Sequence, residues 1–247
     1  MPLILNLDTS TQICSVALAS DGAILGTRES HEEKSHARQL SVFIRDLLKE
    51  NELEVAGLDA VAVSMGPGSY TGLRIGISTA KGLAYGGSIP LIGIGTLASL
   101  ASGALLNHEI VRILEQDKTS LLCPMIDARR MEVYTALYTP EGNIIEDVSA
   151  QIIDETSFLD KMEKGPVAFF GNGADKCRDT ITHHNAVFVN DIETSAEYMV
   201  PLSENSWQQK KFEDIAYFEP LYLKDFIPTI PRDRILPKGR PETNTES

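Results

Sequence analysis

The sequence predicts an α/β protein built from two halves, each with its segments in the order βββαβα. Two observations carry this prediction. Apolar segments of strand length alternate with segments of helical period along the first hundred residues, and a similar order returns, less clearly, in the rest of the chain. The 247 residues are 43% hydrophobic and 23% charged, a composition typical of a globular protein with a substantial core.

The first half opens with three short apolar segments that are expected to form an antiparallel meander. We predict strands over 3–7, 14–19 and 23–29, and Asp21-Gly22 is a tight-turn sequence between the last two. The polar turn Asp8-Thr9-Ser10-Thr11 joins the first two.

Helices and strands then alternate to about residue 105. The first helix is predicted from Ser35, because apolar residues recur at positions 40, 43, 44, 47 and 48, which is one face of a 3.6-residue period. A strand over 59–65, a helix over 73–85 and a strand over 90–94 follow, and Thr96 is a suitable N-cap for the next helix.

The second half repeats this order. Strands are expected over 121–126, 132–138, 144–148, 167–170 and 186–189, with helices over 156–164, after 171–173 and over 195–209. The predicted organisation is an N-terminal half (1–105), a C-terminal half (106–212), a segment that returns to the N-terminal half (213–231) and a polar, mobile tail (232–247).

Charge and cysteine content exclude several classes of protein. The net charge of −13 argues against a broad basic surface for nucleic acid. Cys14, Cys123 and Cys177 lie far apart with no CxxC pair, which favours buried thiols over a zinc site or disulfides. The first residues lack a basic signal-peptide region, and Lys81, glycines and a proline interrupt the apolar stretch 75–103. We therefore expect a cytoplasmic protein without a membrane span.

Two turns have residues that suit phosphate binding. Asp8, Thr9, Ser10 and Thr11 follow a strand and offer a carboxylate, hydroxyls and N–H groups, although the same residues also make ordinary turns. The second turn lies between a buried strand and a helix, where N–H groups attract anions. Its candidate residues are Gly66, Gly68, Ser69, Thr71 and Gly72, but it is neither a P-loop nor G-x-G-x-x-G, and its glycines also permit tight packing.

The glycine-rich block Gly66-Pro67-Gly68-Ser69-Tyr70-Thr71-Gly72-Leu73-Arg74-Ile75-Gly76 resembles a block of the TsaB family, also called YeaZ. The other matching blocks occur in the same order and cover most of the chain; they are 5–10, 80–84, 127–134, 171–174 and 220–224. The resemblance implies the actin-like ATPase (ASKHA, ribonuclease H-like) superfold with two βββαβα halves.

The resemblance also implies a role and partners. TsaB proteins are non-catalytic paralogues of TsaD, which places a threonylcarbamoyl group on the adenosine beside the anticodon of tRNA. They pair with TsaD, work with the ATPase TsaE, form homodimers when alone, and meet tRNA only through the complex. No cofactor is required, and weak ATP or ADP binding at the two turns is compatible with the fold.

The histidines argue against the metal site of the catalytic paralogue, which has a pair spaced i, i+4 on its first long helix. Here His31 and His36 are five apart and diverge by about 140° on a helix. Leu40 stands where a second histidine would follow His36. We expect no metal and no metalloprotease activity. The alternative function is a nucleotide-dependent phosphotransferase or ATPase that uses Asp8 and the two turns.

The second helix suggests a surface for the partner. Leu73, Ile77, Ala80 and Ala84 cover the sheet, and the neighbouring face has small residues four apart. The predicted interface comprises Gly72, Gly76, Thr79, Leu83, Leu40, Phe43 and Leu47. The alternative is that Gly76 packs against this chain's own sheet or first helix. The charged turn Asp127-Ala128-Arg129-Arg130 is interpreted as a structural or interdomain contact, with Asp and Arg paired.

Overall fold

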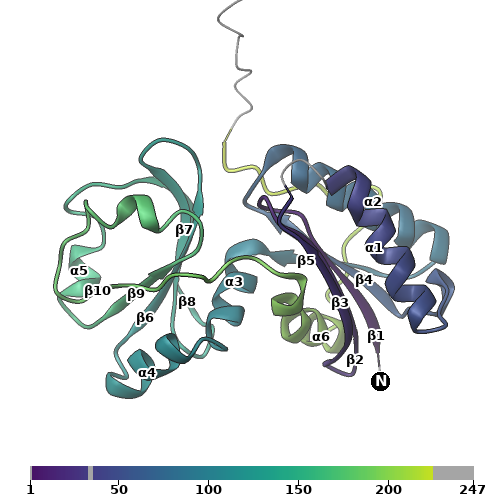
Figure 1. Ribbon diagram of the computed structural model, residues 1–247, viewed down its shortest axis with the longest axis horizontal. Helices are drawn as coiled ribbons and strands as arrows, with labels where there is room; N and C mark the ends of the chain where they lie inside the picture. Colours follow the sequence, from purple (N-terminus) through teal and green to yellow (C-terminus); the bar gives the residue numbers. More distant parts are fainter. Residues whose placement is uncertain (1, 33–35, 225–247) are drawn as a thin grey trace, which may run out of the picture.

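The computed structural model describes residues 2–32 and 36–224, and each half of the molecule has its own five-stranded sheet (Figure 1). The strand orders are β3-β2-β1-β4-β5 and β10-β9-β6-β7-β8. In each sheet three strands form an antiparallel meander and the remaining two extend it in parallel. The predicted α/β class with two similar halves is confirmed.

The first sheet follows the predicted segments closely. Its strands are β1 (Leu3–Asp8), β2 (Cys14–Ser20), β3 (Ala23–Ser30), β4 (Ala60–Gly66) and β5 (Leu91–Gly95). The helices α1 (His36–Glu50) and α2 (Tyr70–Gly87) cover one face of it, and the short 3-10 helix η1 (Val55–Gly57) lies between them in sequence. Their apolar faces and the inward residues of β1, β2 and β4 form one continuous core.

The second sheet contains β6 (Leu121–Asp127), β7 (Glu132–Tyr138), β8 (Ile144–Ile152), β9 (Val167–Phe170) and β10 (Ala186–Phe188). Its strands carry two apolar clusters. The helix α4 (His108–Gln116) contributes Ile110 and Ile113 to the first cluster.

Two predicted helices of this half are much shorter than expected. The segment predicted over 156–164 is helical only in α5 (Leu159–Met162), because Asp154 draws Thr156 and Ser157 into a local hydrogen-bonded turn and Phe158 has a positive φ. The helix expected after 171–173 is the single 3-10 turn η2 (Asp175–Cys177).

Helices on either side of the predicted division at residue 105 pack against the opposite half of the molecule. The helix α3 (Thr96–Ala104) places Leu97, Leu100, Ala101 and Ala104 in the core of the second half. Conversely, the 3-10 helix η3 (Ala196–Met199) and α6 (Val200–Gln208) pack on the free face of the first sheet. Each half therefore buries a helix from the other side of the predicted boundary.

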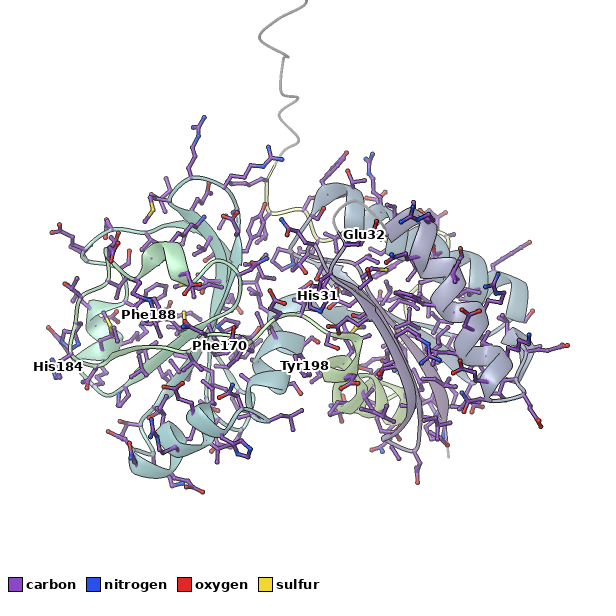
Figure 2. The ribbon with its side chains drawn as sticks, viewed as in Figure 1. His31, Glu32, Phe170, His184, Phe188 and Tyr198 are labelled. Atoms are coloured by element: carbon purple, nitrogen blue, oxygen red, sulfur yellow. The ribbon has the colours of Figure 1, made fainter. Side chains whose placement is uncertain are left out.

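The exchanged helices touch closely where they cross. A Cβ added to Gly103 of α3 would lie 2.1 Å from Tyr198 Cδ2, a residue of η3 that is labelled in Figure 2. At the start of α3, Gly95 is the N-cap, and Thr96, which was predicted to fill that role, is the first helical residue. The Thr96 hydroxyl is buried and has no hydrogen-bond partner among the described residues.

After α6 the chain runs back along the first half. The Glu213 amide donates to the Leu91 carbonyl at 2.8 Å, and the Leu221 amide donates to the Met65 carbonyl at 2.7 Å. The end of the segment predicted over 213–231 and the tail predicted over 232–247 lie outside the described residues. Within the described ranges, no helix has the length and apolar character needed to cross a membrane.

Candidate functional site

The two candidate phosphate turns meet at one edge of the first sheet. The parallel strands β1 and β4 end side by side, so the turn after Asp8 and the loop before α2 leave the sheet together. The Ser69 amide donates to the Ser10 carbonyl at 2.7 Å and joins the two. This edge, made of residues 8–11 and 66–72, is called the turn junction below.

The glycines of the turn junction allow backbone to lie directly on backbone. A Cβ would lie 2.2 Å from the Ser10 carbonyl oxygen at Gly68, and 2.1 Å from the Thr9 carbonyl oxygen at Gly72. At Gly76 it would lie 2.3 Å from Thr9 Oγ1. All three glycines therefore pack against this chain's own first turn. The prediction that Gly72 and Gly76 form a partner surface is wrong, and the inward alternative holds.

Most hydroxyl and amide groups at the turn junction are already bonded within the chain. Thr9 Oγ1 donates to the Gly72 carbonyl at 2.8 Å, and Ser69 Oγ accepts from the Gly72 amide at 3.2 Å. Thr11 Oγ1 lies 2.7 Å from Thr194 Oγ1, which links the turn to the segment before η3. Of the predicted phosphate-binding side chains, Ser69 and Thr71 are exposed.

The loop half of the turn junction is also covered by the returning chain. Gly66 has a φ of +115° and lies so close to residue 221 that an added Cβ would be 2.9 Å from the Leu221 carbonyl oxygen. The junction is thus a packed contact between three segments, built largely from main-chain groups.

Asp8 is the one carboxyl in this contact, and it is only 1% exposed. Its Oδ1 accepts hydrogen bonds from the Ser10 amide at 2.8 Å and the Ser10 hydroxyl at 2.7 Å. Its Oδ2 has no partner within the described part of the chain. Burial raises the pKa of the Asp8 carboxyl, because removing it from water disfavours the charged form.

The two histidines do not converge. His36 is the first residue of α1 and is buried, with Nε2 3.0 Å from the Thr11 carbonyl oxygen. His31 lies before the helix and pairs with Glu29 at 2.9 Å and Glu193 at 3.4 Å (Figure 2). Leu40, one turn after His36, points into the core. In 2–32 and 36–224, no three histidine, cysteine or acidic side chains gather as metal ligands would.

The cysteines agree with the prediction of buried thiols, since all three are free and buried. Burial raises the pKa of the Cys14 thiol to about 12, with a smaller contribution from nearby Asp8. A thiol in this environment is a poor nucleophile.

The outer surface of α1 and α2 differs from the predicted interface. Leu40 and Leu47 are 1% and 0% exposed and belong to the core, so they cannot contact a partner. Phe43, Thr79 and Leu83 are half-buried.

The exposed part of α2 instead contains Ser78, Gly82 and Tyr85, the last 80% exposed. A Cβ at Gly82 would meet nothing within 4 Å. Ser78 and Tyr85 lie beside the sheet-covering face on the side opposite Gly72 and Gly76, and Gly82 lies on the face turned away from the sheet. Helical period alone does not distinguish the two flanks, which is why the sequence missed them.

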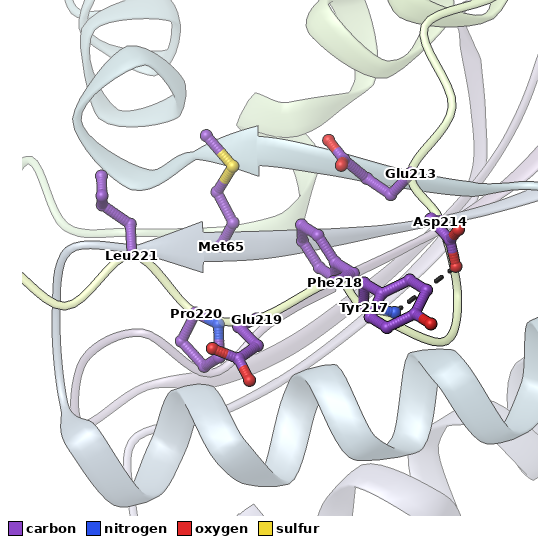
Figure 3. A pocket seen from close by; sticks show the side chains of 8 residues that line it. All are labelled: Met65, Glu213, Asp214, Tyr217, Phe218, Glu219, Pro220 and Leu221. Carbon is purple, nitrogen blue, oxygen red and sulfur yellow. Dashed lines mark hydrogen bonds between the residues drawn. The ribbon is translucent and has the colours of Figure 1, made fainter.

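A shallow depression lies where the returning chain crosses the first sheet (Figure 3). Its volume is about 420 Å³, and its lining residues are Met65, Glu213, Asp214, Tyr217, Phe218, Glu219, Pro220 and Leu221. Three of these eight carry carboxylates, so the depression is poorly suited to an anionic nucleotide.

The charged block at the end of β6 forms different pairs from those expected. Asp127 accepts from the Arg129 amide at 3.0 Å, but its ion-pair partner is Lys176 and not an arginine side chain. The Asp127 amide donates to Asn172 Oδ1 at 2.9 Å, which joins two of the blocks noted in the sequence.

Comparison with known proteins identifies the family. Residues 26–231 match the sequence model of the family described as "TsaD: tRNA N6-adenosine threonylcarbamoyltransferase". The tRNA threonylcarbamoyladenosine biosynthesis protein TsaB of Escherichia coli K12 is 32% identical, over 91% of this chain and 95% of that protein. The protein of the same name from Bacillus subtilis 168 is 28% identical, over 90% and 93%.

A solved structure agrees with these sequence relatives. YeaZ from Pseudomonas aeruginosa superimposes with a TM-score of 0.75 and 26% identity, and the match covers 90% of this chain and all of that one. The match thus spans both sheets. The chain belongs to the TsaB (YeaZ) family, within the wider TsaD family.

Proposed function

We propose that this chain is the non-catalytic partner of a TsaD-type subunit in the biosynthesis of threonylcarbamoyladenosine on tRNA. The names of its relatives support the pathway. The observation that carries the non-catalytic role is the turn junction. Where an actin-like ATPase would receive phosphates, Gly68, Gly72 and Gly76 lie against the backbone and side chain of Thr9 and Ser10.

The partners follow from this role. The chain pairs with the TsaD-type subunit, is joined by a TsaE-type ATPase, and forms a homodimer when alone. It acts in the cytoplasm and meets tRNA as part of the complex. It needs no cofactor of its own, and ATP or ADP binds the isolated chain weakly.

We place the partner surface on the exposed residues Ser78, Gly82 and Tyr85 of α2 and on Val42 and Phe43 of α1. Val42 is 36% exposed and Tyr85 80% exposed, so apolar area is available there. Gly82 leaves open space in which another helix could approach closely.

The test is reconstitution of the modification with each component omitted in turn. The isolated chain should neither modify tRNA nor hydrolyse ATP, and omission of this chain should abolish modification by the remaining subunits. Modification that proceeds without this chain would refute the proposal. ATP turnover by the isolated chain that disappears in Asp8→Ala would instead favour the phosphotransferase or ATPase alternative.

A further inference from the structure

The turn between β6 and β7 has an unusual backbone for its sequence. Arg129 and Arg130 both have positive φ, 69° and 54°. The β2–β3 hairpin has the same combination at Asp21 and Gly22, with φ of 52° and 76°. Asp-Gly is the ordinary sequence for such a turn, whereas two successive arginines are not.

Elsewhere in the described ranges, no two neighbouring residues other than glycine adopt positive φ. The left-handed conformation brings the Cβ of an L-residue close to the next carbonyl oxygen and costs free energy at each position. Residues held in such conformations concentrate at sites where their side chains have a function. The Arg129-Arg130 pair is therefore a candidate for a function outside the fold itself.

The charges around the turn point to an anionic ligand. Its two acids are already paired, Asp127 with Lys176 and Glu132 with Lys224. Arg129 and Arg130 are exposed, and no carboxylate of the described residues lies within 4 Å of either guanidinium as an ion-pair partner. The six side chains comprise four cations and two anions, a sum of +2 in a chain of net charge −13, and the further acids Asp154, Glu155 and Asp175 lie on the adjoining segments.

An aromatic side chain adjoins the cations. Tyr134 of β7 is half-buried against the first apolar cluster of the second half; burial raises the pKa of its hydroxyl, and Lys224, Glu132 and Arg129 lie near enough to make smaller contributions. Arginines beside a partly exposed aromatic ring are a combination that RNA-binding surfaces use for phosphates and for unstacked bases.

We propose that the turn formed by Arg129 and Arg130 contacts the phosphate backbone of the tRNA in the assembled complex. This inference rests on the proposed function. A guanidinium presents a planar fork of donors that matches two phosphate oxygens, and it remains charged at any working pH. Because the rest of the body repels RNA, a local cationic tip decides which side of this subunit the RNA can approach.

The decisive variant is Arg129→Asn with Arg130→Gly, which removes both charges and places at 129 and 130 two residues that tolerate positive φ. The matched control is Arg112→Ser with Lys118→Ser, an equal loss of charge in α4 and in the loop after it, beyond the opposite end of β6. A third variant with lysine at both 129 and 130 keeps the positive charges and lacks the planar donor pair of the guanidinium. Each is assembled with the TsaD-type subunit and titrated with a transcript of a tRNA that reads codons beginning with adenosine.

We expect the Asn-Gly variant to assemble normally and to bind the tRNA about tenfold to a hundredfold more weakly at low salt. The slope of log affinity against log salt should decrease by about two, one for each lost phosphate contact. The lysine variant should keep the slope and lose less affinity, and the α4 control should match the unaltered chain.

Three results would overturn the inference. One is unchanged affinity and slope in an assembled Asn-Gly variant. Another is loss of assembly with the TsaD-type subunit, which would assign the arginines to a protein partner. A third is an equal loss of tRNA affinity in the control variant, which would show that the effect depends only on the net charge of the chain. If the unaltered complex binds and modifies no tRNA, the proposed function itself fails, which these variants do not decide.

Discussion

At the scale of single residues, the Asp8 carboxyl stabilises the turn that follows β1. One oxygen of the carboxyl holds Ser10 by two hydrogen bonds, while the other is buried without a partner. A charged group in this position loses hydration that the Ser10 hydrogen bonds and the nearby Ser64 hydroxyl replace only in part. The neutral form is therefore favoured in the folded chain.

Asp8→Asn should be more stable than the unaltered chain at pH 7–8. Because the pKa of Asp8 is raised in the folded state, the carboxyl costs no folding stability below its ordinary pKa of 3.8, where it is protonated in both states. As pH rises through the folded pKa, the folded chain loses stability, because the carboxyl ionises in a buried position. The variant lacks this penalty and keeps an oxygen for Ser10. Its Tm advantage should thus be largest at neutral pH and disappear toward pH 4. Thermal unfolding across this pH range measures it, and a variant that melts earlier at pH 7–8 would show that the charged form is stabilised.

At the scale of elements, the sequence of α2 predicts which face of the helix covers the sheet but not which side of it contacts the first turn. Leu73, Ile77, Ala80 and Ala84 were predicted to cover the sheet, and all four are buried. The 3.6-residue period of the apolar residues identifies that face, because folding removes apolar side chains from water. It does not determine which flank meets the first turn, since that depends on a main-chain contact between Thr9 and Gly72 that has no periodic signal.

Two sides of α2 can be distinguished by placing the same residue on each. Gly76→Arg should lose about 3 kcal/mol or more of stability, because the new side chain collides with Thr9. Gly82→Arg should fold with stability equal to or up to about 1 kcal/mol above the unaltered chain, since it removes a helix glycine in open space.

In the same pair of variants, Gly82→Arg should fail to dimerise and to bind the TsaD-type subunit. Thermal melting and size-exclusion chromatography with light scattering measure both properties. A folded Gly82→Arg chain that still pairs normally would show that the partner surface lies elsewhere.

The two hairpins with positive φ allow a reciprocal test of turn strain. Arg130→Gly should stabilise the chain by about 0.5–1 kcal/mol, because glycine tolerates the left-handed conformation. Gly22→Arg should destabilise it by a similar amount, since an added Cβ there meets no atom within 4 Å and only the backbone preference changes. Urea unfolding of both variants decides the matter, and changes of the same sign would contradict this account.

At the scale of the whole molecule, the order of segments predicted the α/β class and both meanders, because turns and periods are local properties. The exchange of α3 and α6 could not be predicted in the same way. Both helices have apolar faces, and either sheet could bury them. The choice depends on close contacts such as that between Gly103 and Tyr198, which join residues far apart in sequence.

The candidate site was predicted in part for the same reason. The sequence named residues 8–11 and 66–72 as two separate candidate turns, and the structure brings them together because the parallel strands β1 and β4 end at a common edge. It could not show that the returning segment covers Gly66, since the Leu221 contact is between main chains. Nor could it show that Leu40 and Leu47 are wholly buried, because an apolar stripe looks alike whether it is covered by the chain or by a partner.

The return of the chain along β5 has a mechanical consequence. The first strand and the Glu213 contact both belong to the first half, so the second half is topologically a long loop inserted between them. A force applied between residues 3 and 213 should load the first sheet alone, while the second half carries no tension until that sheet ruptures. In an optical trap the molecule should therefore extend in two ordered steps, the first half before the second, and a single step would show that the crossing of α3 and η3 transmits the load.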